Sequence, residues 1–337
     1  MPKINVALVG FGLSGRYLQA PFFEAHPEFC LKTVVTSQQS LLEIYPTVGR
    51  AGSLAEVLAD ASIDLVSVAS PNDTHFDYAR QSLLAGKHVL VEKPLTATAA
   101  EAEALIALAK AQNKQLFVFQ NRRFDSDFRT IRTLLDSGCL GELLRFEARY
   151  DRFKPLLNPK KWKETEGPGS GILYDLGAHL IDQSIALFGV PVGVWGEAYT
   201  QRAGSNIQDA FDLRLDYGQL KVQLSSSLMV REPSPRYVIH GTKGSFVKYG
   251  IDVQEDHLKA GMLPGDPGFG VESPDFQGIL NTDWQGLAFR GKIESLPGHW
   301  MGLFQNMADV LLRGADPLIP TAEVLTQVRI MEQVGQS

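Results

Sequence analysis

Short apolar runs alternate with alanine- and leucine-rich stretches over the first 120 residues of the chain. The apolar runs carry many β-branched side chains and lie at 4–9, 31–36, 64–69, 88–92 and 115–119. The stretches between them have helical composition, most clearly at 13–25, 74–85 and 98–112. Continuous apolar strands are typical of a sheet covered on both faces, and strand–helix alternation is typical of parallel crossover units. We therefore predict an α/β Rossmann domain with a doubly wound parallel sheet.

The pattern changes after Arg123. We expect a helix over 124–137, a half-buried strand over 143–153, and a second helix over 173–188 after the Gly/Pro-rich loop 166–171. Alternating apolar positions predict further strands at 212–217, 220–230, 236–241 and 244–250. The last two are separated by a tight hairpin turn at 242–244. This half of the chain is predicted to form an α+β domain with a large, mainly antiparallel open sheet.

The predicted domain boundary lies at the change of pattern. Residues 1–122 are assigned to the nucleotide-binding domain and 123–337 to a substrate-binding and oligomerisation domain. Glycine and proline are frequent from about 261 to 298, where we expect irregular structure that hides at most short strands. A helix over 322–334 closes the chain, and we expect it to pack back on the first domain.

Composition excludes several classes of protein. A net charge of −6 without long runs of like charge leaves no electrostatic footprint for nucleic acid. Cys30 and Cys139 belong to no CxxC pair, so we expect two buried thiols and neither a disulfide framework nor a zinc site. No apolar stretch approaches the roughly 18 residues needed to span a bilayer, and the start of the chain does not resemble a signal peptide. These observations predict a cytoplasmic protein without a membrane partner.

The first strand is followed by a glycine-rich loop with the spacing of a dinucleotide site. Gly10, Gly12 and Gly15 form GFGLSG between that strand and a helix. In such a loop the three glycines allow a tight turn, the approach of the pyrophosphate to the backbone, and close helix packing. The helix N-terminus supplies free N–H groups and a positive dipole end for the phosphates. We predict nucleotide binding here.

The residues after the second strand bear on the choice of nucleotide. Thr36, Ser37 and Gln38 stand where an NAD enzyme usually carries a carboxylate for the ribose hydroxyls. Ser37 can donate to a 2′-phosphate, and Arg16 can contribute charge. We predict NADP in preference to NAD, against the alternative that Ser37 only terminates a loop and Arg16 is a solvated surface residue.

Ligands of open α/β sheets bind beyond the carboxyl ends of the strands, so we expect the loops there to carry the binding residues. Ser70, Asn72 and His75 follow one strand, and Glu92 and Lys93 follow the next. A lysine at this place is suited to point its ammonium at the cofactor crevice. From position alone, Lys93 is equally well interpreted as an ordinary exposed lysine.

In the second half, Asp175 and His179 are separated by four residues near the start of a predicted helix and so share one face. A carboxylate beside an imidazole orients it and raises its pKa, which suits a base working near neutral pH. The alternative is a helix-start carboxylate and a core histidine without chemistry. Two metal ligands are a third possibility, but no third ligand with suitable spacing accompanies them, and we predict no metal.

The motifs together resemble a known family. GFGLSG, SPNDTH, the EKP of Glu92 to Pro94, and GSGILYDLGAHLID occur in this order at spacings similar to those of the Gfo/Idh/MocA oxidoreductases. Within that family, NRRFDSDF, YDRFKP and GPGSGILYDLG resemble most the bacterial subgroup of NADP-dependent scyllo-inositol dehydrogenases. Paralogues in that subgroup share these motifs and differ in substrate. The resemblance extends over nearly the whole chain.

The resemblance implies an enzyme that moves a hydride between the nicotinamide and a secondary hydroxyl or ketone of a cyclic polyol or sugar. Lys93 would polarise the substrate oxygen, His179 would exchange the hydroxyl proton, and Asp175 would orient His179; whether Lys93 or His179 is the base stays open. A cis Lys93–Pro94 bond is also implied. The residues expected at the nucleotide are Gly10, Gly12, Leu13, Gly15, Arg16, Ser37, Ser70, Asn72, His75, Glu92 and Lys93. Those expected at the substrate are Asn121, Arg123, Arg152, Trp162, Asp175 and His179.

Two other functions are known on this fold and remain alternatives. One is a nucleotide-binding regulator without catalysis, which has no need of Lys93, Asp175 and His179. The other is a glycoside hydrolase that uses tightly held NAD as a transient oxidant. Family members often pair through the open sheet, so we also expect a homodimer or homotetramer.

Overall fold

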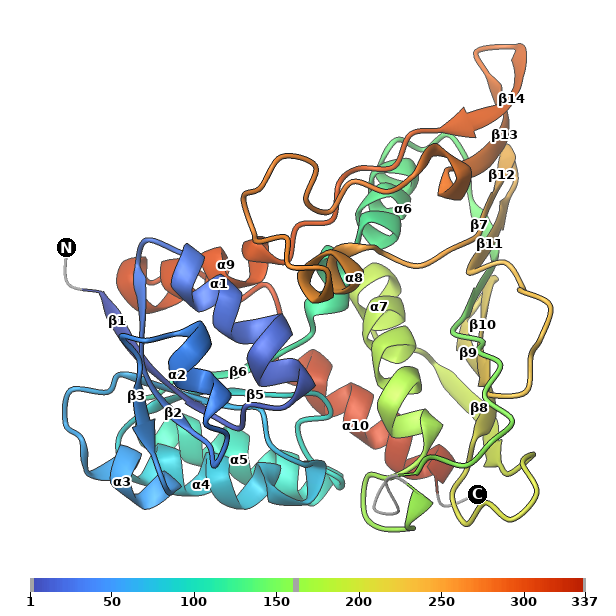
Figure 1. Ribbon diagram of the computed structural model, residues 1–337. Coiled ribbons are helices and arrows are strands. Elements are labelled where there is room, and N and C mark those ends of the chain that lie inside the picture. Colours follow the sequence, from blue (N-terminus) through green and yellow to red (C-terminus); the bar gives the residue numbers. More distant parts are fainter. Residues whose placement is uncertain (1–2, 160–163, 336–337) are drawn as a thin grey trace. The chain divides into compact units, whose positions relative to one another are not determined.

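The computed structural model describes residues 3–159 and 164–335, which form two compact units (Figure 1). The first unit contains residues 1–121 together with two later segments, 254–269 and 300–325. The second contains residues 122–253, 270–299 and 326–337. The domain boundary at 122/123 stays a prediction.

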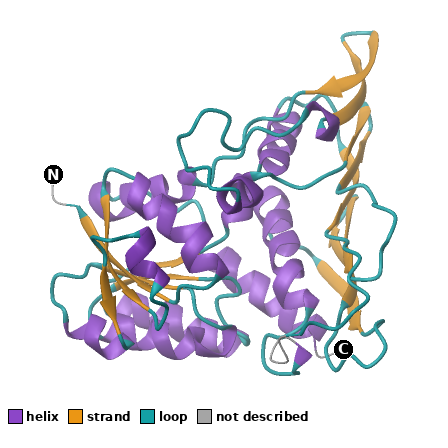
Figure 2. Ribbon diagram, in the orientation of Figure 1, coloured by secondary structure: helices purple, strands orange, loops and turns teal. Residues whose placement is uncertain are grey.

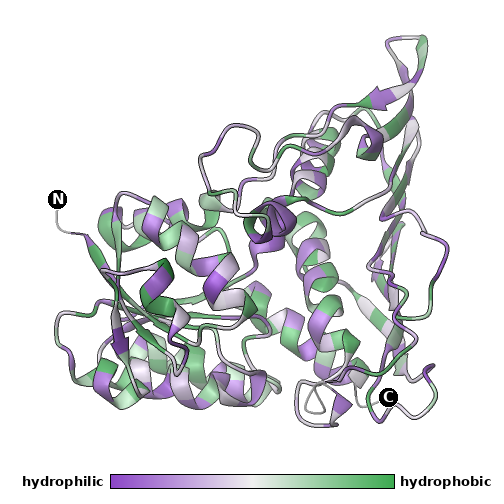
Figure 3. Cartoon of the chain, in the orientation of Figure 1, coloured by the Kyte–Doolittle hydropathy of each residue, from purple (hydrophilic) through white to green (hydrophobic). Residues whose placement is uncertain are grey.

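The first unit is built on a six-stranded sheet in the order β3-β2-β1-β4-β5-β6, and all its pairings are parallel. Figure 1 shows helices on both faces of this sheet. Central strands β4 and β5 are apolar and buried almost throughout, as strands covered on both faces must be. Figure 3 shows hydrophobic residues concentrated on these strands. The strands are β1 Ile4–Val9, β2 Phe29–Val35, β3 Gly49–Ala51, β4 Leu65–Val68, β5 His88–Val91 and β6 Leu116–Val118.

The helices of this unit begin and end at recognisable signals. In α5, the Thr98 hydroxyl accepts from Glu101 N while the Glu101 carboxylate accepts from Thr98 N, a capping box. A second signal is Gly314, which ends α9 in the left-handed conformation. The helices are α1 Ala20–Ala25, α2 Ser40–Ile44, α3 Leu54–Ala59, α4 His75–Leu84, α5 Ala99–Ala111, α8 Gln254–Lys259 and α9 Met301–Arg313.

Aromatic packing explains why late segments join the first unit. The ring of Phe304 on α9 stacks on Phe22 of α1 at 5.0 Å and meets Phe23 edge-on at 4.9 Å. Trp300 and Phe269 also lie against Phe22, and Trp300 is fully buried. Large aromatic side chains bury much apolar area each, so this cluster fixes the late segments against α1.

The second unit is built on an eight-stranded sheet in the order β14-β13-β12-β11-β7-β10-β9-β8. Every neighbouring pair is antiparallel except β7 and β10. Helices α6 and α7 lie on one face of this sheet, as Figure 2 shows. The strands are β7 Leu143–Arg149, β8 Gly193–Tyr199, β9 Ala210–Tyr217, β10 Leu220–Ser227, β11 Tyr237–Gly241, β12 Gly244–Lys248, β13 Gly278–Trp284 and β14 Leu287–Ile293; the helices are α6 Ser126–Asp136 and α7 Ala178–Phe188. The predicted fold class is confirmed.

Several details differ from the sequence-based expectation. The segment 261–298, expected to be irregular, contains the full-length hairpin β13–β14, whose turn residues Gln285 and Gly286 have φ of 53° and 83°. Most of β14 is exposed, including its apolar Leu287 and Phe289, and the frequent glycine and proline around the hairpin hid its alternating pattern. Cys30 and Cys139 are half-buried free thiols and not buried ones. The closing helix α10, Thr321–Gly335, is divided between the two units.

A buried ion pair ties β12 to the loop before β13 in the second unit. Lys248 Nζ lies 2.8 Å from both carboxylate oxygens of Glu272 and donates to the carbonyl of Phe276. The two side chains are 0% and 3% exposed. We expect Lys248→Met to lower the free energy of unfolding by about 3 to 5 kcal/mol, because it leaves a buried carboxylate without its cation. Equilibrium urea unfolding measures this.

Two variants control this prediction. The double variant Lys248→Met/Glu272→Leu should recover most of the loss, because no buried charge then remains unpaired. The exposed pair of Lys259 and Glu255 offers a matched comparison at the surface, and Lys259→Met should cost less than about 1 kcal/mol. A loss in Lys248→Met no larger than that in Lys259→Met would contradict the importance of the buried pair.

Candidate functional site

The residues expected at the nucleotide all follow adjacent strands of the parallel sheet. Gly10 to Arg16 follow β1, Ser37 follows β2, Ser70 to His75 follow β4, and Glu92 and Lys93 follow β5. These strands are neighbours in the order β2-β1-β4-β5, so their carboxyl ends meet at one edge of the sheet. The fold therefore brings these predicted residues to the edge where such sheets bind ligands.

The glycine loop is tight on one side and open on the other. Gly10 has a φ of 101°, and a Cβ atom on Gly15 would lie 2.1 Å from the Gly10 carbonyl oxygen. In contrast, a Cβ atom on Gly12 would meet no protein atom within 4 Å. The loop closes on itself at Gly15 and leaves space in front of Gly12, which fits the approach of a pyrophosphate to the backbone.

The helix after this loop begins with a π-helical turn, Ser14–Gln19. Its hydrogen bond runs from Ala20 N to Gly15 O, five residues back. A second π-helical turn, Leu173–Gly177, precedes α7 in the second unit, and there Ala178 N donates to Leu173 O. Such turns occur often at functional sites because the extra residue redirects the side chains that follow. The sequence predicted an uninterrupted helix at both places.

The end of β2 presents polar groups without a carboxylate at Thr36 to Gln39. Ser37 is exposed, while the side-chain amide of Gln38 donates to the carbonyl of Phe11 in the glycine loop at 2.8 Å. This contact fastens the β2 loop to the β1 loop. The arrangement leaves no negative charge from these residues where an NADP 2′-phosphate would require a neutral or positive surface.

His75 fastens the two neighbouring loops to each other. Its imidazole is fully buried, with Nδ1 2.8 Å from the carbonyl oxygen of Pro94 and Nε2 3.1 Å from that of Ser70. Burial lowers the pKa of this imidazole below its usual value. The Lys93–Pro94 bond is cis, as the family resemblance implied. His75 thus holds the loop that carries Lys93, and its contact with the nucleotide stays a prediction.

In the second unit, Asp175 and His179 lie at the junction of the π-helical turn and α7. Asp175 is exposed, and its backbone N–H donates to Gly171 O at 3.1 Å. His179 is only 5% exposed, and the ring of Tyr150 from the end of β7 meets its imidazole edge-on, with centroids 6.3 Å apart. One residue of the predicted pair therefore faces solvent while the other is held by packing.

The remaining predicted substrate residues have different surroundings. Arg123 makes a buried ion pair with Asp182 of α7, with Nε 2.8 Å and Nη2 2.6 Å from the two carboxylate oxygens. Asn121 is 3% exposed, and Arg152 is half-buried just after β7. Trp162 lies outside the described residues. Arg123 has a structural partner, so its guanidinium anchors α7 whatever else it contacts.

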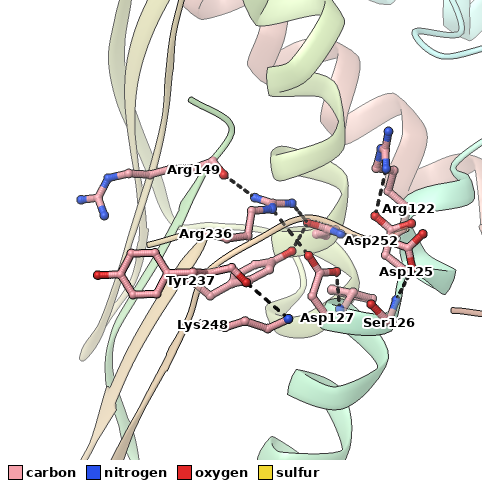
Figure 4. Close-up of polar contacts among 12 residues, drawn as sticks. Arg122, Asp125, Ser126, Asp127, Arg149, Arg236, Tyr237, Lys248 and Asp252 are labelled. Carbon is pink, nitrogen blue, oxygen red and sulfur yellow. Dashed lines mark hydrogen bonds and ion pairs between the residues drawn. The ribbon is translucent and has the colours of Figure 1, made fainter. Parts of the chain in front are cut away.

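A cluster of buried charges lies between the sheet of the second unit and its helices (Figure 4). Arg236 is 3% exposed; its guanidinium lies 3.5 Å from the centre of the Tyr150 ring and 3.6 Å from Asp127. It also donates to the carbonyl of Arg149 at 2.8 Å. Burial raises the pKa of Tyr150 to about 12, so its phenol stays neutral. The cluster supports the tyrosine that packs on His179, and sequence reasoning missed it because a strand arginine usually faces solvent.

Residues 3–159 and 164–335 contain no group of three or more His, Cys, Asp or Glu side chains placed to hold a metal ion. Among the same residues, no helix is both long enough and apolar enough to cross a membrane.

Comparison with known proteins identifies relatives of both units. Residues 4–120 match the family model described as "Oxidoreductase family, NAD-binding Rossmann fold". Residues 132–337 match the model described as "Oxidoreductase family, C-terminal alpha/beta domain". The scyllo-inositol 2-dehydrogenase (NADP(+)) IolW of Bacillus subtilis is 36% identical over 335 residues, 99% of this chain and 93% of that protein. The structure of the putative oxidoreductase yvaA from Bacillus subtilis superimposes with a TM-score of 0.94 at 35% identity, covering 98% of this chain and 95% of the other.

A more distant relative has a different named substrate. The D-glucoside 3-dehydrogenase of Escherichia coli is 29% identical over 192 residues, 56% of this chain and 55% of that protein. The predictions of an oxidoreductase and of a nucleotide-binding Rossmann domain are confirmed, while the roles of individual residues stay predictions. The chain belongs to the Gfo/Idh/MocA family of oxidoreductases.

Proposed function

We propose that this oxidoreductase uses NADP to oxidise a secondary hydroxyl of a cyclic polyol or sugar, or to reduce the corresponding ketone. The observation that carries the cofactor assignment is the carboxylate-free end of β2, where Ser37 is exposed beside the glycine loop. The relative IolW, similar over nearly its full length, is named as an NADP(+) enzyme acting on scyllo-inositol. An inositol-like ring is therefore the first substrate class to test. The free thiols Cys30 and Cys139 fit a cytoplasmic location, because that reducing compartment keeps cysteines unpaired.

The chemistry assigned to the chain is proton transfer and charge stabilisation. When bound, the nicotinamide supplies the acceptor or donor of the hydride. His179 takes or returns the hydroxyl proton, and Asp175 orients its imidazole. The Lys93 ammonium stabilises the charge that develops on the substrate oxygen. Which of Lys93 and His179 is the base is decided by the pH dependence of variants at each position.

We also propose that two copies of the chain pair through the open sheet of the second unit. The face away from α6 and α7 carries Trp195, 56% exposed, with the Arg214 guanidinium 5.8 Å above its ring. On the same face, Glu147 lies between Arg145 and Arg149 and forms ion pairs with both. A broad face with an exposed tryptophan and self-complementary charges fits an isologous interface.

The function is tested with purified protein, NADP or NAD, and a panel of inositols, aldoses and sugar acids, followed by nicotinamide absorbance. We expect NADP reduction with at least one inositol. Lys93→Ala and His179→Ala should each lower kcat by about 10²- to 10⁴-fold, the usual contribution of a positioned acid, base or charge. Exposed Lys110→Ala is the control and should leave kcat unchanged.

Three outcomes would contradict parts of this proposal. Equal dissociation constants for NADPH and NADH would refute the cofactor preference. Tight NADP binding without turnover of any compound would favour the regulator without catalysis. A nucleotide that co-purifies with the protein and is recycled during cleavage of a glycoside would favour the hydrolase.

The glycine loop makes a prediction that separates binding from folding. Gly12→Ala should leave the thermal midpoint unchanged, because its Cβ meets no protein atom, yet it should weaken NADPH by roughly tenfold or more, which is about 1.4 kcal/mol of binding free energy. In contrast, Gly15→Ala should destabilise the fold, because its Cβ collides with the Gly10 carbonyl. Differential scanning fluorimetry and NADPH fluorescence titration measure the two effects. Unchanged NADPH affinity in Gly12→Ala would place the pyrophosphate elsewhere.

The oligomeric state is measured by light scattering coupled to size exclusion. We expect a dimer or tetramer mass for the wild type and a shift toward the monomer in Trp195→Glu, because the new charge would be buried in the interface. Leu84→Glu, at an exposed position of α4, is the matched control. A monomer mass for the wild type would refute pairing.

A further inference from the structure

A buried hydrogen-bond network joins the glycine loop to the backbone of Lys93 in the first unit. The carboxylate of Glu92, a residue that is 9% exposed, accepts on Oε1 from the hydroxyl of Ser14 and from Nε2 of Gln19, the latter at 2.9 Å. Its other oxygen accepts from the backbone N–H of Lys93 at 3.1 Å. Two of the three donors begin and end the π-helical turn Ser14–Gln19, and the third is the backbone of the lysine loop itself.

Gln19 is the centre of this network. It is fully buried, and its amide nitrogen also lies 3.2 Å from the Ser14 hydroxyl. Its carbonyl oxygen accepts from the hydroxyl of Ser67 on β4 at 2.5 Å. Only a side chain that donates and accepts at once can bridge Ser67 and Glu92. The π-helical turn that ends at Gln19 sets the direction of this side chain.

Burying a carboxylate costs folding free energy unless hydrogen-bond donors surround it. A buried group that loses its hydrogen-bond partner destabilises the fold by more than a formed hydrogen bond stabilises it. Without Gln19, Oε1 of Glu92 keeps a single donor, Ser14, among these three partners, and the Ser67 hydroxyl loses its acceptor. The carboxylate would then turn to find another donor. Because the same carboxylate holds Lys93 N, its turn would release the backbone that aims the lysine.

We propose that Gln19 is a positioning residue: through Glu92 it fixes the backbone of Lys93 and ties it to the glycine loop. This inference rests on the proposed function only in that Lys93 is taken to act on the substrate oxygen. The carboxylate of Glu92 then fixes the position of the glycine loop relative to Lys93, and so the position of a bound nucleotide relative to the lysine. The network acts on turnover more than on nucleotide affinity.

The first test removes the bridge. In Gln19→Leu/Ser67→Ala, where no buried hydroxyl is left without an acceptor, we expect kcat to fall roughly tenfold while the NADPH dissociation constant changes by less than about threefold. Ser82→Ala is the matched control, because Ser82 is equally buried but donates only to Tyr78 O of its own helix. Its kcat should equal that of the wild type. A double variant with wild-type kcat would overturn the proposal.

The second test changes the bridge into a titrating group. Gln19→Glu places two carboxylates at hydrogen-bond distance, so the pair retains one proton up to a raised pKa. While that proton is present it replaces the amide N–H, so kcat should stay within about threefold of the wild type near pH 6 and fall roughly tenfold toward pH 9. A merely structural role would lower the thermal midpoint and leave the shape of the pH profile unchanged, and that result would overturn the proposal.

A third measurement needs no turnover. The rate of acetylation of Lys93 relative to exposed Lys110 is followed at pH 9 by mass spectrometry of peptides. In Gln19→Leu/Ser67→Ala the backbone of Lys93 is less constrained, so the relative rate should differ from that of the wild type by roughly threefold or more. An unchanged ratio would overturn the proposal that the network positions Lys93. If the wild type oxidises nothing in the panel, the proposed function fails, and the labelling ratio still decides the inference.

Discussion

The first unit depends on one buried anion, the carboxylate of Glu92. A carboxylate that is nearly removed from water is stable only where several donors converge on it. Here the donors are Ser14 in the glycine loop, Gln19 in the π-helical turn, and the backbone of Lys93. The same anion therefore holds the segment after β1 and the loop after β5 in a fixed relation at the carboxyl edge of the parallel sheet.

The second unit uses paired charges for a comparable purpose. Arg123 with Asp182 anchors the middle of α7, while Arg236 is stacked on Tyr150, whose ring packs on His179 near the start of that helix. Buried pairs contribute little net stability, but they tolerate few alternative arrangements because each broken pair leaves an uncompensated charge. The helix that carries His179 is thus fixed in register by these buried groups.

The parts of the fold that were predictable from the sequence are those with one strong periodic signal. Continuous apolar runs identified β1, β4 and β5. The glycine loop identified the first turn, because its three glycines have the fixed spacing that a nucleotide-binding turn requires. Strand β14 was missed because the many glycines and prolines around it were interpreted as irregular structure, although its apolar residues alternate with charged ones. Helix α9 was missed although its buried Leu303, Phe304, Met307 and Val310 have helical spacing; only its place against Phe22 depends on tertiary packing. Gln19 and Arg236 were missed because each is a polar residue at a buried position, and single-sequence patterns assign such residues to the surface.

This division explains why the cofactor class follows from the sequence more directly than the substrate. The nucleotide is held mainly by backbone groups at strand ends, and backbone geometry is dictated by a few glycines at fixed spacing. A sugar or polyol ring is distinguished by side chains on several loops, where one moved hydroxyl or carboxylate changes which stereoisomer leaves a buried polar group unpaired. Relatives of this chain are accordingly named for different substrates, scyllo-inositol in one case and a D-glucoside in another. Substrate identity must therefore be sought in side chains that differ between relatives and not in the motifs that define the family.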